Sequence, residues 1–347
     1  MTSTDFPASG RASADDAQPK QADPMAERAA DIAADDPDHT EVAPGAAAVE
    51  PAPIKRTPVA VARGVVRTMR PKQWVKNILV LAAPFAGGVL FSGGLALHLA
   101  VAFVAFSLAA SGIYLVNDAN DVAADRAHPT KRRRPIAAGI VPVKLAFAVA
   151  AVLLAAAIAI SLLASAQLTV VVGVYVAVQL AYCFWLKHQP VLDICIVASG
   201  FLLRAVAGGA ATGIPLSQWF LLSAGFGSLF MVAGKREAEV ALLGQDGETR
   251  AVLGAYTPAF LRHVRTVASG VAMTAYCLWA FERAQGSAGA IWFELSIVPF
   301  VLGVLRYALI VDSGGGAAPE EIVLGDRMLQ LMGVIWAVIV AVGLYVA

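Results

Sequence analysis

The chain contains 347 residues, of which 58% are hydrophobic and only 15% are charged, and its mean hydropathy is +0.69. These values exclude an ordinary soluble globular domain and indicate an integral membrane protein. The formal net charge is +1, but this near balance hides two oppositely charged regions.

The first 54 residues form an acidic segment that is rich in Ala, Asp and Pro. It contains eleven acidic residues against three basic ones. Because such a segment cannot bury enough apolar surface to offset its ordering entropy, we expect residues 1–54 to be a disordered tail. It also lacks the basic start and apolar run of a signal peptide. Residues 55–347 hold 23 basic and 14 acidic residues, a net charge of +9 that should lie near anionic headgroups or phosphate ligands.

After the tail, apolar segments of about 20 residues predict an all-α fold with nine transmembrane helices. These segments cover residues 75–95, 97–117, 142–163, 167–186, 190–213, 216–234, 263–283, 288–311 and 327–347. Lys and Arg gather before the first segment and after the second, fourth and sixth, whereas the opposite connections contain only Arg283. By the positive-inside rule, we expect a multi-pass protein of the plasma (inner) membrane with its N-terminus and long loops in the cytoplasm.

A carboxylate cluster and a basic cluster follow the second apolar segment, in the run NDANDVAADRAHPTKRRRPIAAG that begins at Asn117. On a helix, Asn117, Asp121 and Asp125 recur at i, i+4 and i+8, so the spacing predicts three oxygen-bearing side chains on one face. Asp118 lies about 100° round the helix and is expected at the edge of that face. Magnesium binds through one or two carboxylates plus substrate phosphates, so we predict a Mg²⁺-held diphosphate here. The alternative is a solvated helix end.

Two charged residues fall inside the fifth apolar segment, where an ionised side chain is costly unless it has a partner or faces a cavity. Asp193 and Arg204 are eleven positions apart, so they share a helix face but lie roughly 16 Å apart and cannot pair directly. Each needs another partner. The alternatives are that Asp193 caps the helix and that Arg204 is an interhelical bridge. Gly208, Gly209 and Gly213 indicate close helix packing.

The motif Asn117-x3-Asp121-x3-Asp125 resembles the first aspartate-rich motif of the UbiA superfamily of intramembrane prenyltransferases. The resemblance covers essentially everything after residue 60, through the segments RPKQWVKN, HPTKRRRPIAAG, LLRAVAGGAATG, GKREAE and APEEIVLGDRMLQ. It implies nine transmembrane helices around a central cavity. These segments are most similar to the branch that transfers 5-phosphoribosyl from 5-phosphoribosyl 1-diphosphate to a polyprenyl (decaprenyl) phosphate. That reaction releases diphosphate and leads to the arabinose donor of the cell wall.

One departure from the superfamily pattern favours this branch. Aromatic prenyltransferases of the superfamily carry a second aspartate-rich motif in the loop after the sixth helix. The corresponding positions here are Gly234, Lys235, Arg236, Glu237 and Glu239, so basic side chains replace most of those carboxylates. Arg can bind phosphate oxygens bidentately and Lys supplies a compact positive charge, which suits direct phosphate binding.

The resemblance and the reaction together assign roles to particular residues. Magnesium on Asn117, Asp121 and Asp125 should stabilise the departing diphosphate, while ribose C1 develops oxocarbenium-like character. We expect the remaining candidates to bind the phosphates of the two substrates or to line the cavity, with no strong general base: Lys76, Asn77, Asp118, Lys131, Arg132, Arg133, Arg134, Tyr182, Lys187, Arg204, Lys235, Arg236 and Glu239.

Several of these residues have a second interpretation. Tyr182 is equally well read as an interfacial aromatic anchor, and Lys76 and Asn77 as part of a membrane-anchoring segment. Glu239 is placed either to orient Lys235 through an i,i+4 pair or to add a magnesium ligand. Lys235, Arg236 and Lys187 are the predicted site for the lipid phosphate.

Two other functions stay open from the sequence. The first is transfer of a prenyl group to an aromatic or lipid acceptor by another enzyme of the same superfamily. The second is a lipid transporter or flippase that uses Asp193 and Arg204 within a cavity, although repeated halves, the usual signature of such folds, are not evident. The expected partners are the lipid bilayer and the two phosphorylated substrates, with no nucleic acid, and a homo-oligomer is compatible with the sequence.

Overall fold

The structure is a computed structural model that describes residues 57–246, 253–314 and 319–346. All regular secondary structure within these ranges is helical, as the apolar pattern predicts. The predicted tail, residues 1–54, lies outside the described residues.

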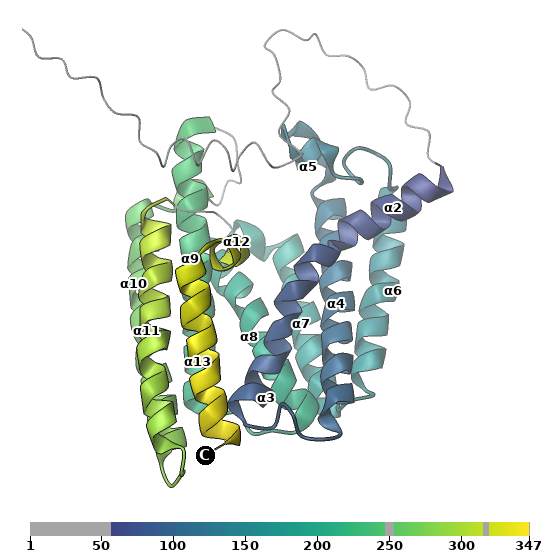
Figure 1. The fold of residues 1–347 in the computed structure, drawn as a ribbon. Helices are drawn as coiled ribbons and strands as arrows, with labels where there is room; N and C mark the ends of the chain where they lie inside the picture. The colour runs from purple at the N-terminus through teal and green to yellow at the C-terminus, as the bar shows by residue number, and fades with distance from the viewer. Residues whose placement is uncertain (1–56, 247–252, 315–318, 347) are drawn as a thin grey trace, which may run out of the picture. The chain divides into compact units, whose positions relative to one another are not determined.

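The first part of the described chain contains α2 (Pro58–Met69), η1 (Pro71–Leu81), α3 (Ala82–Ala86), α4 (Leu95–Asn120), α5 (Val122–Ala127), η2 (Lys131–Arg133), α6 (Val143–Ser161), α7 (Ala166–Phe184), η3 (Leu186–His188) and α8 (Leu192–Thr212). In this part, one run of helices descends to α3, and the long helices that follow alternate in direction (Figure 1). The second part contains α9 (Gln218–Asp246), η4 (Leu253–Ala255), α10 (Pro258–Ala284), α11 (Ala290–Asp312), α12 (Pro319–Gly325) and α13 (Arg327–Tyr345).

Within the described residues, six helices are long and apolar enough to cross a membrane, namely α4, α6, α7, α8, α11 and α13. This number does not confirm the predicted nine. Two further predicted segments fall on α9 and α10, which are longer than expected and carry charged side chains.

The first predicted segment, residues 75–95, is wrong as a single helix. The chain there forms a 3₁₀ helix of 11 residues and a five-residue α-helix, and then turns through Gly88 and Gly94 at positive φ. A 3₁₀ helix of this length is uncommon and has three faces, because residues i and i+3 eclipse. Trp74 and Asn77 share one face and donate to Ser111 and Ser107 of α4.

Helix α4 is the most buried of the six apolar helices, with 67% of its apolar window inside the bundle. Its small residues allow α6, α7 and α8 to approach closely, and together they form the largest hydrophobic core cluster. The predicted close packing is confirmed at Gly208, where an added Cβ would lie 1.9 Å from the Val80 carbonyl oxygen of η1. Gly213 has a different role, since it ends α8 in the left-handed conformation.

Polar elements gather at one end of the bundle. Figure 1 places α5, the start of α2, the end of α9 and α12 at this end, and α3 and the C-terminus at the opposite end. This arrangement brings the predicted aspartate motif and the GKREAE segment to the same end, although about 100 residues separate them in the chain.

Candidate functional site

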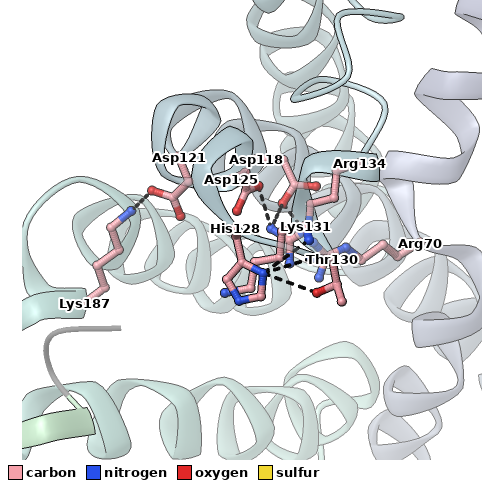
Figure 2. Close-up of polar contacts among 9 residues, drawn as sticks. All are labelled: Arg70, Asp118, Asp121, Asp125, His128, Thr130, Lys131, Arg134 and Lys187. Atoms are coloured by element: carbon pink, nitrogen blue, oxygen red, sulfur yellow. Dashed lines mark hydrogen bonds and ion pairs between the residues drawn. The ribbon is translucent and has the colours of Figure 1, made fainter. Parts of the chain in front are cut away.

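Three carboxylates from the junction of α4 and α5 meet three basic side chains from other parts of the chain (Figure 2). The Arg70 guanidinium donates to Asp118 at 2.8 Å, and Arg134 bridges Asp118 at 3.3 Å and Asp125 at 2.8 Å. The Lys187 ammonium contacts Asp121. We call these six residues the acidic cluster: Arg70, Asp118, Asp121, Asp125, Arg134 and Lys187.

The grouping of the carboxylates corrects one expectation. Asp118 is buried and shares Arg134 with Asp125, whereas Asp121 faces Lys187 on the other side (Figure 2). The helix geometry explains this, because residues seven apart differ by only about 20° in direction. Asn117 and Asp125, eight apart, differ by about 80°. Asp118 is therefore central to the cluster and not at its edge.

Backbone conformation directs these side chains. Helix α4 ends at Asn120, but the Asp121 amide still donates to the Asn117 carbonyl at 2.9 Å and the Asp125 amide to the Asp121 carbonyl at 2.8 Å, which keeps the turn helical. Arg70 ends α2 with φ 53°, a left-handed conformation that is uncommon outside glycine. From there its guanidinium lies 4.6 Å from the ring centroid of Tyr114 on the way to Asp118.

His128 orders the loop that carries the basic run. Its Nδ1 accepts the amide N–H of Thr130 at 3.3 Å and that of Lys131 at 3.4 Å. Arg134, at the end of this loop, is the residue of the basic run whose guanidinium reaches both Asp118 and Asp125. Arg132 is exposed. The structure thus distinguishes the members of the predicted basic segment, since Arg134 contacts the carboxylates and Arg132 is exposed.

The donor set of the acidic cluster fits magnesium shared with a substrate. Carboxylate and amide oxygens are the hard ligands that this ion prefers. Within the described parts of the chain, no three His, Cys, Asp or Glu side chains are grouped so that they would hold a metal ion by themselves. An all-protein cage does not fit these residues, whereas an ion bound by one or two carboxylates and completed by phosphate oxygens does. The roles of Asn117, Asp121 and Asp125 as metal ligands stay a prediction.

A second polar cluster joins α8 to α9. The Arg236 guanidinium donates to both carboxylate oxygens of Asp193, at 2.9 and 3.1 Å, and also to Glu239. The Tyr182 hydroxyl donates to the same Asp193 carboxylate at 2.7 Å. Asp193 therefore has the partners that its burial requires, and it does not cap the helix. We call Tyr182, Asp193, Arg236 and Glu239 the α8–α9 cluster.

The predicted loop after the sixth segment is wrong, because residues 234–239 lie within α9. The run of Ala, Glu, Lys, Arg and Leu has good helix propensity, which explains the extension. Lys235 and Glu239 form the anticipated i,i+4 pair, at 3.9 Å, with the Lys235 side chain 38% exposed. Arg236 is instead turned into the protein. These two neighbours, predicted to act together, have different surroundings.

Arg204 forms an interhelical bridge, one of the two interpretations of its sequence position. Its guanidinium donates to Asn77 at 2.7 Å, to the Gly200 carbonyl at 2.6 Å and to the Tyr175 hydroxyl at 3.2 Å. It does not bond Asp193. Lys76, next to Asn77 on η1, lies 5.9 Å from the ring centroid of Phe201. Substrate contacts for Lys76, Asn77 and Arg204 stay predictions.

Sequence reasoning missed two features of this end of the bundle. The sequence showed Arg70 only as one of the basic residues before the first apolar segment. Its ion pair with Asp118 becomes evident only when the left-handed conformation of Arg70 is known. The second feature is a buried network in which Arg265 of α10 donates to Glu237 of α9 at 2.9 Å and to Asp312 of α11 at 3.1 Å. Because Glu237 and Arg265 lie 28 residues apart on different helices, the sequence gives no local signal of this pairing.

Comparisons with known proteins agree with the fold. The UbiA prenyltransferase family model matches residues 78–324. The chain is 48% identical over 328 residues to the decaprenyl-phosphate phosphoribosyltransferase of Corynebacterium glutamicum, covering 93% of this chain and 99% of that relative. It is 52% identical over 299 residues to the enzyme of the same name from Mycobacterium tuberculosis (strain H37Rv), covering 85% of this chain and 98% of that relative.

A solved structure of a UbiA homolog from Archaeoglobus fulgidus, bound to GPP and Mg²⁺, superposes with a TM-score of 0.64. The sequence identity is 18%, and the match covers 81% of this chain and 98% of that chain. At this identity the likeness shows the fold alone, and it confirms the predicted UbiA-like all-α architecture.

Proposed function

Because the chain belongs to the UbiA prenyltransferase family, we propose that it transfers 5-phosphoribosyl from 5-phosphoribosyl 1-diphosphate to decaprenyl or another polyprenyl phosphate. The observation that carries this proposal is the identity of 48% and 52% to two decaprenyl-phosphate phosphoribosyltransferases that match over nearly their whole length. The product lipid would serve as a precursor of cell-wall arabinan.

The reaction exchanges one phosphate oxygen for another at ribose C1. The bond from C1 to the diphosphate oxygen breaks, and its electron pair leaves with the diphosphate. An anionic oxygen of the lipid phosphate forms the new bond to C1 from the opposite side. Because the attacking oxygen is already deprotonated, no strong general base is required.

The acidic cluster is the proposed site for the diphosphate. A bound Mg²⁺ supplies positive charge to the departing phosphate oxygens. Asp121 and Asp125, with Asn117, would hold that ion. Arg134 and Arg70 already lie beside these carboxylates, and their side chains are 27% and 33% exposed. They can therefore donate to phosphate oxygens without leaving the cluster, a role in which bidentate Arg is favoured.

The lipid phosphate is proposed to bind between the acidic cluster and α9. Lys235 has an exposed ammonium group at this end of the bundle, and Lys187 lies on η3, beside the start of α8. Arg236 is held by Asp193 and Glu239, so its role would be to fix the position of α9 and not to grip the phosphate directly. This division revises the predicted joint action of Lys235 and Arg236.

The orientation proposed for the site is cytoplasmic, in the plasma membrane. Arg70, Arg134 and Lys187 flank apolar segments and lie in the acidic cluster itself, and the positive-inside rule assigns that end of the bundle to the cytoplasm. Both the soluble diphosphate and the headgroup of a lipid in the inner leaflet would reach it there.

The test uses the purified full-length chain with Mg²⁺, decaprenyl phosphate and 5-phosphoribosyl 1-diphosphate labelled in the ribose. The expected result is ribose label in the organic-extractable lipid together with release of diphosphate. A parallel reaction contains labelled geranyl diphosphate and an aromatic acceptor. Label transferred only in the second reaction would overturn the proposal in favour of prenyl transfer. Label transferred in neither reaction would rule out both activities.

A further inference from the structure

The connection between α7 and α8 contains a strained turn. Val191 has φ 69° and ψ −50°, and the Leu192 amide donates to the Pro190 carbonyl at 2.8 Å. This is a three-residue γ-turn of the rare form, and a β-branched residue at positive φ is a backbone outlier. Such a conformation persists only when the surrounding structure holds it.

The hydroxyl of Tyr256 holds this turn from another part of the chain. It accepts the Val191 amide N–H at 2.8 Å, a hydrogen bond that the γ-turn itself does not supply. Tyr256 is only 5% exposed and packs in a hydrophobic cluster with Ile194 of α8, Val232 of α9 and Leu261 of α10. Burial raises the pKa of the Tyr256 hydroxyl, so it stays a neutral phenol. The acceptor is thus fixed by three helices.

The turn separates two residues that define the polar end of the bundle. Lys187, four residues before Val191, contacts Asp121 of the acidic cluster. Asp193, two residues after Val191, receives Arg236 and Tyr182 in the α8–α9 cluster. A change of direction at Val191 would therefore move the Lys187 ammonium and the Asp193 carboxylate relative to each other.

We infer that Tyr256 is a positioning residue for the transfer reaction: its hydroxyl holds the Val191 turn, and the turn sets Lys187 against Asp121 and Asp193 against Arg236. This inference rests on the proposed function, because its consequence is the relative placement of the diphosphate site and the lipid phosphate site. Tyr256 acts through the backbone of residue 191.

The energetic contribution of the Tyr256 hydroxyl should depend on which residue stands at position 191. Glycine adopts positive φ with little steric cost, whereas valine does not. The Tyr256 hydroxyl should therefore matter when residue 191 is Val and should matter much less when it is Gly. A hydroxyl that acted only in general packing would have the same effect in both backgrounds.

The chain offers a matched control at the other end of the bundle. The Tyr345 hydroxyl also accepts a backbone amide of a distant segment, that of Leu90 at 3.1 Å. Tyr345→Phe removes the same kind of bond beside α3 and leaves the polar end untouched. It measures what the loss of one such hydroxyl costs when no strained turn depends on it.

The experiment measures phosphoribosyl transfer by the full-length chain carrying Tyr256→Phe, Val191→Gly, both changes, or Tyr345→Phe. We expect Tyr256→Phe to lower kcat/KM by about threefold to tenfold, the size expected for one lost hydrogen bond. In the Val191→Gly background the same change should alter kcat/KM by less than about twofold. Tyr345→Phe should retain wild-type kinetics.

Amide hydrogen exchange of the peptide that covers residues 186–193 gives a second readout that needs no substrate. Exchange in this peptide should become faster in Tyr256→Phe and stay unchanged in Tyr345→Phe. Wild-type kinetics and exchange for Tyr256→Phe, or an equal loss in both residue-191 backgrounds, would overturn the inference. An inactive wild-type chain would instead refute the proposed function, while the exchange result would still test whether Tyr256 holds the turn.

Discussion

The acidic cluster and the Glu237–Arg265 network are both ion-pair clusters at the same end of the bundle, but they differ in how their arginines are used. In the network, Arg265 is 7% exposed and donates to Glu237, to the Ala308 carbonyl and to Asp312. Each of its nitrogen atoms has a partner within the protein. In the acidic cluster, Arg134 is 27% exposed and donates through a single nitrogen, Nη1, to Asp118 and Asp125.

This difference separates a structural ion pair from one that can change partners. A buried Arg with a protein partner at each nitrogen atom stabilises the packing of α9, α10 and α11, and a new ligand would have to break protein bonds to reach it. A partly exposed Arg that shares one nitrogen between two carboxylates can rebind a phosphate at small cost. Charge pairs that look alike in sequence thus differ in their burial and in the number of donor atoms that the protein already uses.

The largest expected effect is on stability, from Arg265→Met. This change leaves Glu237 buried without its main partner, so the free energy of unfolding should fall by about 3–5 kcal/mol. Thermal unfolding in detergent measures it. Arg262→Met is the matched control, because Arg262 bonds the same Glu237 at 3.3 Å but is 60% exposed. If both variants lost stability equally, burial would not distinguish the two kinds of pair.

Asp121→Asn should give the largest effect on activity. It keeps the shape of the side chain and removes one negative charge from the predicted magnesium ligands, so kcat/KM should fall by about 100-fold to 1,000-fold. The thermal unfolding temperature should stay close to that of the wild type. Asp312→Asn, in the Glu237–Arg265 network, serves as the control and should keep its activity. Near-normal magnesium-dependent turnover in Asp121→Asn would remove the metal assignment.

Arg134→Lys tests whether the planar guanidinium is needed. Lysine keeps the charge but cannot bridge two carboxylates and a phosphate with fixed geometry, so the KM for 5-phosphoribosyl 1-diphosphate should rise by about tenfold. Arg132→Lys, two residues earlier in the same basic run and exposed, should leave KM unchanged. Steady-state kinetics at saturating lipid phosphate compare the two. Equal effects would mean that the basic run acts only as a diffuse positive surface.

Local patterns predicted the composition of the acidic cluster better than its geometry. The spacing of the carboxylates and the basic run singled out residues that the structure brings together, and the i,i+7 relation of Asp118 to Asp125 was available from helix geometry alone. The partners could not be predicted in the same way. Arg70 reaches Asp118 from its own left-handed backbone conformation, and Lys187 lies 66 residues from Asp121 in the chain. Such pairs are set by tertiary packing, which a single sequence does not specify.

The fold was likewise predicted only where a local sequence pattern specifies it. Hydropathy predicted an all-α membrane protein and located the apolar helices α4, α6, α7, α8, α11 and α13. It failed where an apolar run is not one helix, as in η1 and α3, because Pro84 and the glycines that follow interrupt the α-helical pattern. It also ended α9 too early, since charged residues with good helix propensity continue the helix beyond the apolar segment.

Lys187→Met tests whether the acidic cluster exchanges its cations. The Lys187 ammonium and a divalent ion compete for the same Asp121 carboxylate, so removing the ammonium should tighten Mn²⁺ binding by about fivefold, equivalent to a partly exposed ion pair of about 1 kcal/mol. Titration calorimetry or electron paramagnetic resonance measures this without turnover. Lys235→Met, whose partner is Glu239 in the α8–α9 cluster, provides the comparison and should leave the affinity unchanged. Weaker Mn²⁺ binding in Lys187→Met would contradict the competition.

The smallest effect is expected at Asp326, whose ion pair with Arg306 belongs neither to the acidic cluster nor to the Glu237–Arg265 network. Asp326 caps α13 by accepting the Leu329 amide at 2.7 Å, and it bonds Arg306 of α11 at 2.7 Å. The Arg306 hydrogen bond and the Leu329 amide lower the pKa of Asp326 from its usual value of 3.8. The unfolded chain therefore takes up the proton first as the pH falls. The stabilisation by the ionised Asp326 is thus present above about pH 4 and is lost as pH falls through the folded pKa.

The difference in unfolding temperature between the wild type and Asp326→Asn should stay constant from about pH 8 to pH 5 and narrow below about pH 4. A difference that already changed above pH 5 would show that another titrating group controls this helix end.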